Sequence, residues 1–247
     1  MKRILIAAIF FSGVIGARAQ LFDTSAAQVE LVATLMGTGR VVTANVTVTR
    51  ERNKKQAKIA DNLLYLRDGD LRLEHKPADE PTLAKLTAKL KKTDLAEVVT
   101  ILLPKANKAY LILPGKRTYL ESTVVTAGEK AQSSRTESKL LRVENLDGHP
   151  CTVRRMTIIG QDDSRQEVVI WEATDLRNVI IKSEMDHGDD TMEVLRLTNI
   201  KFEKPADDKF ALPPQYRKLS AEDAGSIAET MMEFDLDRDA AVADALR

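Results

Sequence analysis

The stretch that decides the fold begins at Glu137 and ends at Phe202: ESKLLRVENLDGHPCTVRRMTIIGQDDSRQEVVIWEATDLRNVIIKSEMDHGDDTMEVLRLTNIKF. It alternates apolar segments with short segments rich in Gly and Asp. Gly reaches positive φ and Asp bonds to nearby backbone groups, so the short segments are predicted turns. We therefore predict a long antiparallel meander, to which the rest of the chain adds strands or cover. Its strands are Glu137–Asn145, Cys151–Ile159, Glu167–Thr174, Asn178–Met185 and Met192–Phe202.

Several of these predicted strands are apolar on both faces. Val168 and Ile170 point one way, whereas Val169 and Trp171 point the other way. An antiparallel sheet with one wet face alternates more cleanly. Each uncovered Val or Leu forgoes about 1.5–3 kcal/mol of burial, and a bare apolar face would be sticky. Either both faces are partly covered, or one face lines an internal cavity, which we favour over a bare surface.

The residues before the meander predict further strands. Arg40–Arg50 alternates Val and Ala with Thr and Asn, which is typical of a half-buried strand. Asp68-Gly69 is a strong hairpin signal between two apolar runs. The remaining predictions are a turn and a charged strand in Glu51–Ala60, hairpin strands at Asn62–Arg67 and Leu71–His75, and strands at Thr100–Leu103, Ala109–Leu113 and Arg117–Glu121.

A helix is predicted between Pro81 and the next strands. Leu83, Leu86, Leu90, Leu95 and Val98 recur at helical spacing, and lysines occupy the other face. The pattern is one amphipathic helix, or two helices joined near Thr93-Asp94. Its apolar face must cover the sheet, the only large partner available. We interpret the lysines as a solvated face in preference to a contact with anionic lipid.

The C-terminal region predicts an extended segment and a helix. Pro205–Pro214 is expected to lie along the domain, anchored by Phe210 and Tyr216. Ser220 with Asp223 three residues later resembles a capping box. A helix is then expected to run toward Leu246.

The N-terminus carries the pattern of a secretory signal peptide. Lys2 and Arg3 precede an apolar run from Ile4 to Ile15, which is too short to cross a bilayer, and Ala17-Arg18-Ala19 follows. We predict cleavage after Ala19 and export. No Cys lies near the cleavage site, so no lipid anchor is expected, and no later stretch predicts an integral membrane protein. Ser25–Leu35 fits helical and strand spacing, and we favour a short helix.

Composition excludes some classes of protein. The net charge is zero, whereas a nucleic-acid-binding protein needs a basic face. The single cysteine, Cys151, has no partner for an internal disulfide. We interpret it as a small apolar strand residue, because Arg154 and Arg155 give only weak support for a reactive thiol.

Motifs that carry chemistry are absent from the sequence. There is no Gly-rich phosphate loop, nucleophile elbow or paired His ligand set, so no enzymatic activity and no cofactor are predicted. His75, His149 and His187 are expected at surfaces or turns. Phe234–Asp239 resembles the start of an EF-hand, but Ala240 replaces the Gly of the turn and Leu246 replaces the bidentate Glu. We favour an acidic helix-to-helix turn there, and a solvated hairpin tip at Asp186–Asp190, over metal sites.

Several motifs between Arg40 and Lys218 resemble those of one known group of proteins. Ala109–Glu121 resembles the Tyr-x-x-x-Pro-x-x-Lys-x-Tyr hairpin of that group. Val169–Leu176 is similar to its VWxAxDL strand. Gly148–Val153, Leu197–Ile200 and Phe210–Tyr216 resemble further segments in the same order. By these motifs the chain resembles the LolA-like periplasmic proteins, and most closely their uncharacterised DUF4412 relatives.

The resemblance implies a mainly β, α+β fold in which a large curved antiparallel sheet forms an unclosed barrel with helices over its concave face. It also implies an apolar cavity that takes acyl chains, a periplasmic location and an early-strand arginine that controls a lid. Arg40 and Arg50 are the candidates for that arginine. The expected domains are the signal peptide at 1–19, a LolA-like half-barrel at 20–218 and a C-terminal helical tail at 219–247. The tail has no obvious counterpart in the family.

Two functions remain as hypotheses. The first is a non-catalytic carrier of an acyl chain, lipid or lipoprotein. The second is an envelope interaction or sensing module with a packed core, whose C-terminal tail docks to an envelope protein. For the carrier, the predicted cavity lining is Val42, Val46 and Val48 on the early strand, Leu83, Leu86 and Leu90 on the helix, and Trp171 on the meander.

Overall fold

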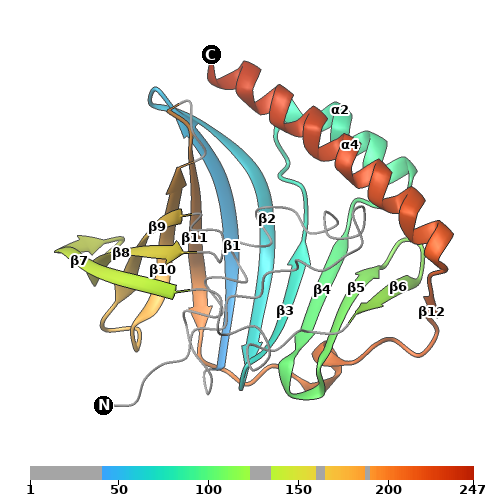
Figure 1. Ribbon diagram of the computed structural model, residues 1–247, viewed down its shortest axis with the longest axis horizontal. Coiled ribbons are helices and arrows are strands. Elements are labelled where there is room, and N and C mark those ends of the chain that lie inside the picture. The colour runs from blue at the N-terminus through green and yellow to red at the C-terminus, as the bar shows by residue number, and fades with distance from the viewer. Residues whose placement is uncertain (1–40, 123–134, 160–164, 187–189) are drawn as a thin grey trace.

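The computed structural model describes residues 41–122, 135–159, 165–186 and 190–247. These residues form one open sheet of twelve strands, in the order β12-β6-β5-β4-β3-β2-β1-β11-β10-β9-β8-β7 (Figure 1). Every pairing is antiparallel except that of β12 with β6. Two α-helices lie on one side of the sheet (Figure 1). The predicted fold class, mainly β with helices over a curved sheet that is not closed into a barrel, is confirmed.

Most strand boundaries follow the sequence patterns closely, but the charged strand predicted within Glu51–Ala60 and the strand predicted at Asn62–Arg67 form a single strand, β2, and β12 was not predicted. The strands are β1 Val41–Arg52, β2 Lys55–Arg67, β3 Asp70–His75, β4 Val98–Leu103, β5 Lys108–Leu113, β6 Thr118–Ser122, β7 Arg135–Leu146, β8 His149–Ile159, β9 Arg165–Ala173, β10 Val179–Asp186, β11 Met192–Lys201 and β12 Arg217–Lys218. The helices are α2 Ala84–Lys92 and α4 Ala221–Leu246, and short 3-10 turns lie at η2 Pro81–Leu83, η3 Pro104–Ala106 and η4 Asp207–Phe210.

The predicted turns have the backbone geometry that their residues favour. Asp68 and Gly69 have φ values of 52° and 96°, and Asp147 and Gly148 have 54° and 88°. Gly tolerates this left-handed region, and Asp enters it more readily than most residues. The predicted helix is shorter than its apolar spacing indicated. It ends at Lys92, because Asp94 has a φ of 58°, and Val98 begins β4 instead.

β1 joins the two halves of the sheet. It pairs with β2 on one side and with β11 on the other, with Val46 opposite Leu197 and Val48 opposite Leu195. The meander β7–β11 is therefore one half of a continuous wall, and β1–β6 is the other half (Figure 1).

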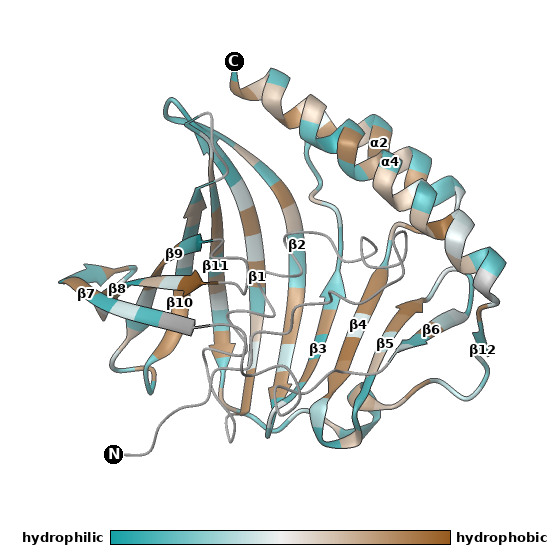
Figure 2. Cartoon of the chain, in the orientation of Figure 1, coloured by the Kyte–Doolittle hydropathy of each residue, from teal (hydrophilic) through white to brown (hydrophobic). Residues whose placement is uncertain are grey.

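One face of the sheet, here called the helix face, is covered by α2 and α4. It carries Val46 and Val48 of β1 and, through direct strand pairings, Leu111 of β5. The first half of α4 packs with α2, with Ile227 and Phe234 in one core with Leu90 and Leu111. The last turns of α4 add side chains to the core of the first strands. The buried side chains there are Val242 and Leu246. Figure 2 shows apolar and polar residues interspersed along this helix.

The other face, here called the opposite face, is also covered over β4 and β5. Val99, Ile101 and Ile112 form a separate core with Phe210 from the segment after β11. The Arg67 guanidinium lies 4.2 Å from the centre of the Phe210 ring. The prediction that this segment is anchored by Phe210 and Tyr216 is confirmed, since both side chains pack on this core.

Some predictions fall outside the described residues. These are the signal peptide, the Ser25–Leu35 segment and the position of His187. Cys151 is described and is fully buried within β8, as expected for a small apolar residue. Burial raises the pKa of its thiol above the usual range.

Candidate ligand-binding site

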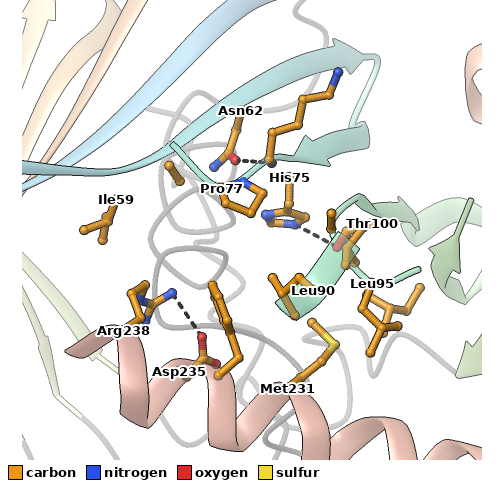
Figure 3. Close-up of a pocket in the computed structure, with 16 residues that line it drawn as sticks. Ile59, Asn62, His75, Pro77, Leu90, Leu95, Thr100, Met231, Asp235 and Arg238 are labelled. Atoms are coloured by element: carbon orange, nitrogen blue, oxygen red, sulfur yellow. Dashed lines mark hydrogen bonds and ion pairs between the residues drawn. The ribbon is translucent and has the colours of Figure 1, made fainter. Parts of the chain in front are cut away.

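A cavity of about 80 Å³ lies beneath the two helices. Strands β2 to β5 form its floor on the helix face, and α2 and α4 form its roof (Figure 3). It is lined by Ile59, Ala60, Asn62, His75, Lys76, Pro77, Leu90, Leu95, Ala96, Val98, Thr100, Leu111, Met231, Phe234, Asp235 and Arg238.

Most of the wall is apolar. Leu90 comes from α2, Leu95 and Val98 from the segment that leads into β4, and Leu111 from β5. All four belong to the core that α4 completes with Phe234 and Met231. These aliphatic and aromatic surfaces favour a ligand that carries hydrocarbon.

The polar part of the wall comes from strands β2 to β4 and from α4, which contributes the ion pair of Asp235 and Arg238. The side-chain oxygen of Asn62 accepts a hydrogen bond from the backbone N–H of Lys76 at 3.2 Å. The Nε2 atom of His75 lies 3.1 Å from the hydroxyl of Thr100. Figure 3 shows His75 between Pro77 and Thr100, on the strand side of the cavity. The cavity therefore combines a hydrocarbon-lined region with a few placed polar groups.

Charged side chains fix α4 above this cavity. Arg50 of β1 lies 3.4 Å from a Glu193 carboxylate oxygen of β11 and 2.7 Å from a carboxylate oxygen of Asp239 on α4. Arg238 of α4 pairs with Asp235 at 3.0 Å and with Asp239 at 3.1 Å. Arg50 is 7 % exposed and Glu193 is fully buried, so this network ties the helix to the interior of the sheet.

Of the two arginines that the resemblance suggested, Arg50 is the one that the structure describes. Its guanidinium contacts the helix that roofs the cavity. Arg40 lies outside the described residues. Arg50 thus forms a charged contact between the first strand, β1, and the covering helix, α4.

The seven predicted lining residues are not all brought together. Leu90 lines the cavity. Val42, Val46, Val48 and Leu83 are buried in the main core on the helix face, and Leu86 of α2 is half-buried between that core and the one around Leu90.

Trp171 lies on the opposite face. Thr47 is paired with Arg196, Arg196 with Lys182, and Lys182 with Trp171, so all four point to the same side as Thr47 and away from Val46 and Val48. The Lys182 ammonium lies 4.3 Å and the Arg142 guanidinium 5.7 Å from the ring centre of Trp171. The indole N–H donates to Glu144. Trp171 is therefore buried under charged side chains on the face away from the cavity.

The sequence contained an overlooked signal for the polar residues of the site. Asn62 alternates with Leu64 and Leu66, so its side chain occupies a core-facing position of β2. Arg50 continues the buried series of β1 in the same way. Arg238 lies in the apolar stripe of α4, between Phe234 and Val242. A polar residue at a core-facing position is rare unless it has a structural or functional partner.

No group of His, Cys, Asp and Glu in the described part of the chain has the arrangement of a metal site. The predicted acidic turn at Phe234–Asp239 is wrong, because these residues continue the helix α4. Their carboxylates pair with cations, including Asp237 with Lys89 at 3.8 Å. Within the described ranges, no helix combines the length and apolarity that crossing a membrane requires.

Comparisons with known proteins yield distant likenesses in structure. No protein-family model matches the chain, and no curated protein matches its sequence. The crystal structure of MucB is 13% identical with a TM-score of 0.40, and the match covers 78% of this chain and 65% of MucB. A PNGF-II structure is 13% identical with a TM-score of 0.44, and the match covers 76% of this chain and 33% of that protein. The chain thus spans less than two thirds of these first matches.

Smaller solved proteins are matched over more of their length. A LolA superfamily protein from Nitrosomonas europaea is 12% identical with a TM-score of 0.33, and the match covers 70% of this chain and 90% of that protein. The resemblance to DUF4412 relatives in particular finds no support in a family model. At these identities and TM-scores, none of the likenesses assigns the chain to a family.

Proposed function

We propose that this protein is a non-catalytic carrier that binds the acyl chain of a lipid or lipoprotein between the sheet and the helices α2 and α4. The observation that carries the proposal is the cavity beneath these helices, with its apolar wall and its few polar groups. The predicted signal peptide would place the carrier in the periplasm.

The size of the cavity defines what binding requires. Pockets for small ligands occupy about 300–1,000 Å³, whereas this cavity has about 80 Å³. An acyl chain therefore enters only if part of the roof moves. Movement of α4 would join the cavity to the apolar surfaces now covered by Phe234 and Met231. The arrangement of α2 and α4 is thus proposed to be the closed conformation of the carrier.

The polar lining gives the ligand an orientation. The hydrocarbon would lie against Leu90, Leu95 and Leu111. The polar head would lie toward Asn62, His75 and Thr100, which already form hydrogen bonds at the strand side.

The test uses two adjacent methionines of α4. Met231 lines the cavity, whereas Met232 is half-buried but does not line it. Binding of a fluorescent fatty acid to the purified protein is measured by titration. Met231→Trp fills the cavity and should weaken binding at least tenfold, while Met232→Trp should leave it unchanged. Thermal unfolding of both variants controls for loss of fold.

Two results would overturn the carrier proposal. The first is a wild-type protein that does not bind the probe at any concentration below its solubility limit. The second is equal binding by Met231→Trp and Met232→Trp. Mass spectrometry of protein purified without detergent supplies an independent readout, since a carrier is expected to retain a lipid.

A further inference from the structure

We infer that strand β7 is a docking surface for a second copy of this chain, and that two molecules pair β7 to β7 in antiparallel fashion. β7 lies at one end of the sheet (Figure 1). Among the described strands it pairs only with β8. It has 12 residues and no proline, so it presents a long edge of the kind that accepts another strand.

Two large apolar side chains are exposed on this strand. Leu140 is 54% and Val143 is 71% exposed. Only Leu236, on α4, joins them as an exposed large apolar residue in the described ranges. Singly exposed apolar residues need no explanation, but two on one strand that has a single partner among the described strands are notable, because its other edge can be covered by pairing.

A bulge places these two residues on the same face. Leu140 is opposite Arg154 and Arg142 is opposite Val153, so Leu141 is the extra residue of β7. Val143 is then opposite Thr152. Because Arg154 and Thr152 are two residues apart, Leu140 and Val143 point to the same side of the sheet. Without the bulge, their odd spacing would place them on opposite sides.

The sequence of β7 is complementary to itself in one register. If the two-fold axis passes between Leu141 and Arg142, Leu140 of each copy lies opposite Val143 of the other. Lys139 of each copy then lies opposite Glu144 of the other. Both side chains are at least partly exposed. Apolar contacts and opposite charges across strands stabilise a pairing. The contacts occur twice because the axis repeats them.

The neighbouring register lacks this complementarity. If the axis moves by one residue, to between Leu140 and Leu141, Lys139 lies opposite Arg142. Glu137 then lies opposite Glu144. Like charges directly opposite destabilise a strand pair. The charge pattern therefore favours the register centred between Leu141 and Arg142 over this neighbour.

The paired edge lies at the far end of the sheet from β6 and β12, beside which α4 begins (Figure 1). Pairing would join two sheets into one continuous sheet through a strand that contributes no residue to either cavity. The inference is therefore independent of the carrier proposal. Failure of either one would leave the other in place.

The first test is the oligomeric state of the full chain. Analytical ultracentrifugation should show a concentration-dependent dimer. Val143→Lys and Leu140→Lys should each raise the dimer dissociation constant at least tenfold. Leu236→Lys is the matched control, because it places the same charge at a similarly exposed apolar site, and it should leave the dimer unchanged. Circular dichroism checks that each variant is folded.

The second test uses disulfide cross-linking to determine the register of the β7–β7 pairing. Leu140→Cys is mixed with a size-tagged Val143→Cys chain and oxidised gently, and Cys151 does not interfere because it is buried. The mixed disulfide-linked dimer should form faster than either homodimer. A monomer at all concentrations, a dimer that the lysine variants do not weaken, or equal cross-linking in all combinations would overturn the inference.

Discussion

At the scale of single residues, Arg50 has the most consequential position. It is the last buried residue of β1, and it connects Glu193 in the sheet with Asp239 on α4. Its two carboxylate partners differ in environment. Glu193 is fully buried, whereas the Asp239 side chain is 47% exposed. The two halves of the contact should therefore contribute very differently to stability.

Arg50→Met is expected to lower the free energy of unfolding by about 3 kcal/mol, because it removes the charge that faces a buried carboxylate. Asp239→Asn is the matched control. It alters the exposed partner and should cost less than about 1 kcal/mol. Chemical denaturation of the three proteins measures both values. If both variants lowered the free energy of unfolding equally, the buried Arg50–Glu193 pair would contribute no more to stability than the exposed Arg50–Asp239 pair.

Trp171 supports a second prediction at this scale. Arg142 and, to a smaller extent, the indole N–H of Trp171 hold the pKa of Glu144 below its ordinary value of 4.5. The carboxylate form is therefore favoured in the folded state, and its contribution is present at neutral pH and lost as the pH falls through this lowered pKa. Trp171 is the single tryptophan of the chain, so its fluorescence reports on this change directly.

The emission of Trp171 should accordingly change with a midpoint below pH 4.5, while far-ultraviolet circular dichroism stays constant. Glu144→Gln should remove this transition. A midpoint at or above the ordinary glutamate value would mean that the Arg142 and Trp171 contacts do not persist in solution.

At the scale of elements, the observed packing of helix α4 differs most from what the sequence predicted. The sequence predicted a C-terminal helix begun by Ser220, and the Ser220 hydroxyl does accept the Asp223 backbone N–H at 3.1 Å. The interaction-module hypothesis treated this tail as a detachable docking segment. In the structure the helix buries Ile227, Phe234, Val242 and Leu246. Each such side chain is worth about 1.5–3 kcal/mol when buried.

Deletion of Ala221–Arg247 is therefore expected to prevent formation of a stable monomer, because the lost burial rivals the total stability of about 5–15 kcal/mol of a typical domain. Leu236→Ala, on the exposed side of the same helix, is the control and should leave the unfolding temperature unchanged. Solubility and thermal unfolding measure both. A truncated protein that folds normally would restore the docking-tail hypothesis.

At the scale of the whole molecule, the ion pair between Arg50 of the sheet and Asp239 of α4 suggests how entry of the proposed acyl ligand is controlled. The Asp239 side chain is half-exposed, so salt screens its attraction to Arg50. Opening of the roof should therefore depend on ionic strength.

The rate at which the protein takes up a fluorescent fatty acid is expected to rise with ionic strength. Asp239→Asn should take up the probe faster at low salt and should lose most of the salt dependence. Stopped-flow fluorescence measures both rates. An uptake rate that does not change with salt in the wild-type protein would exclude this ion pair as the barrier to opening.

The sequence by itself determined the strands, their turns and the two-sided burial of the central strands. These features depend on local patterns: period-two alternation, Asp-Gly turns and apolar runs. The end of helix α2 at Lys92 could not be predicted from the sequence. Leu95 and Val98 continue the helical spacing, although Val98 belongs to β4.

Only the tertiary structure decided which face each residue occupies and which polar groups meet. The alternation of β9 separated Ile170 from Trp171, but it could not say which one faces the helices. That depends on strand registers between β1, β11, β10 and β9, and a slip of one residue exchanges the two faces. Likewise, Arg50 meets Glu193 and Asp239 across more than 140 positions of chain. Such long-range pairs follow from the global arrangement of the sheet, which no local pattern encodes.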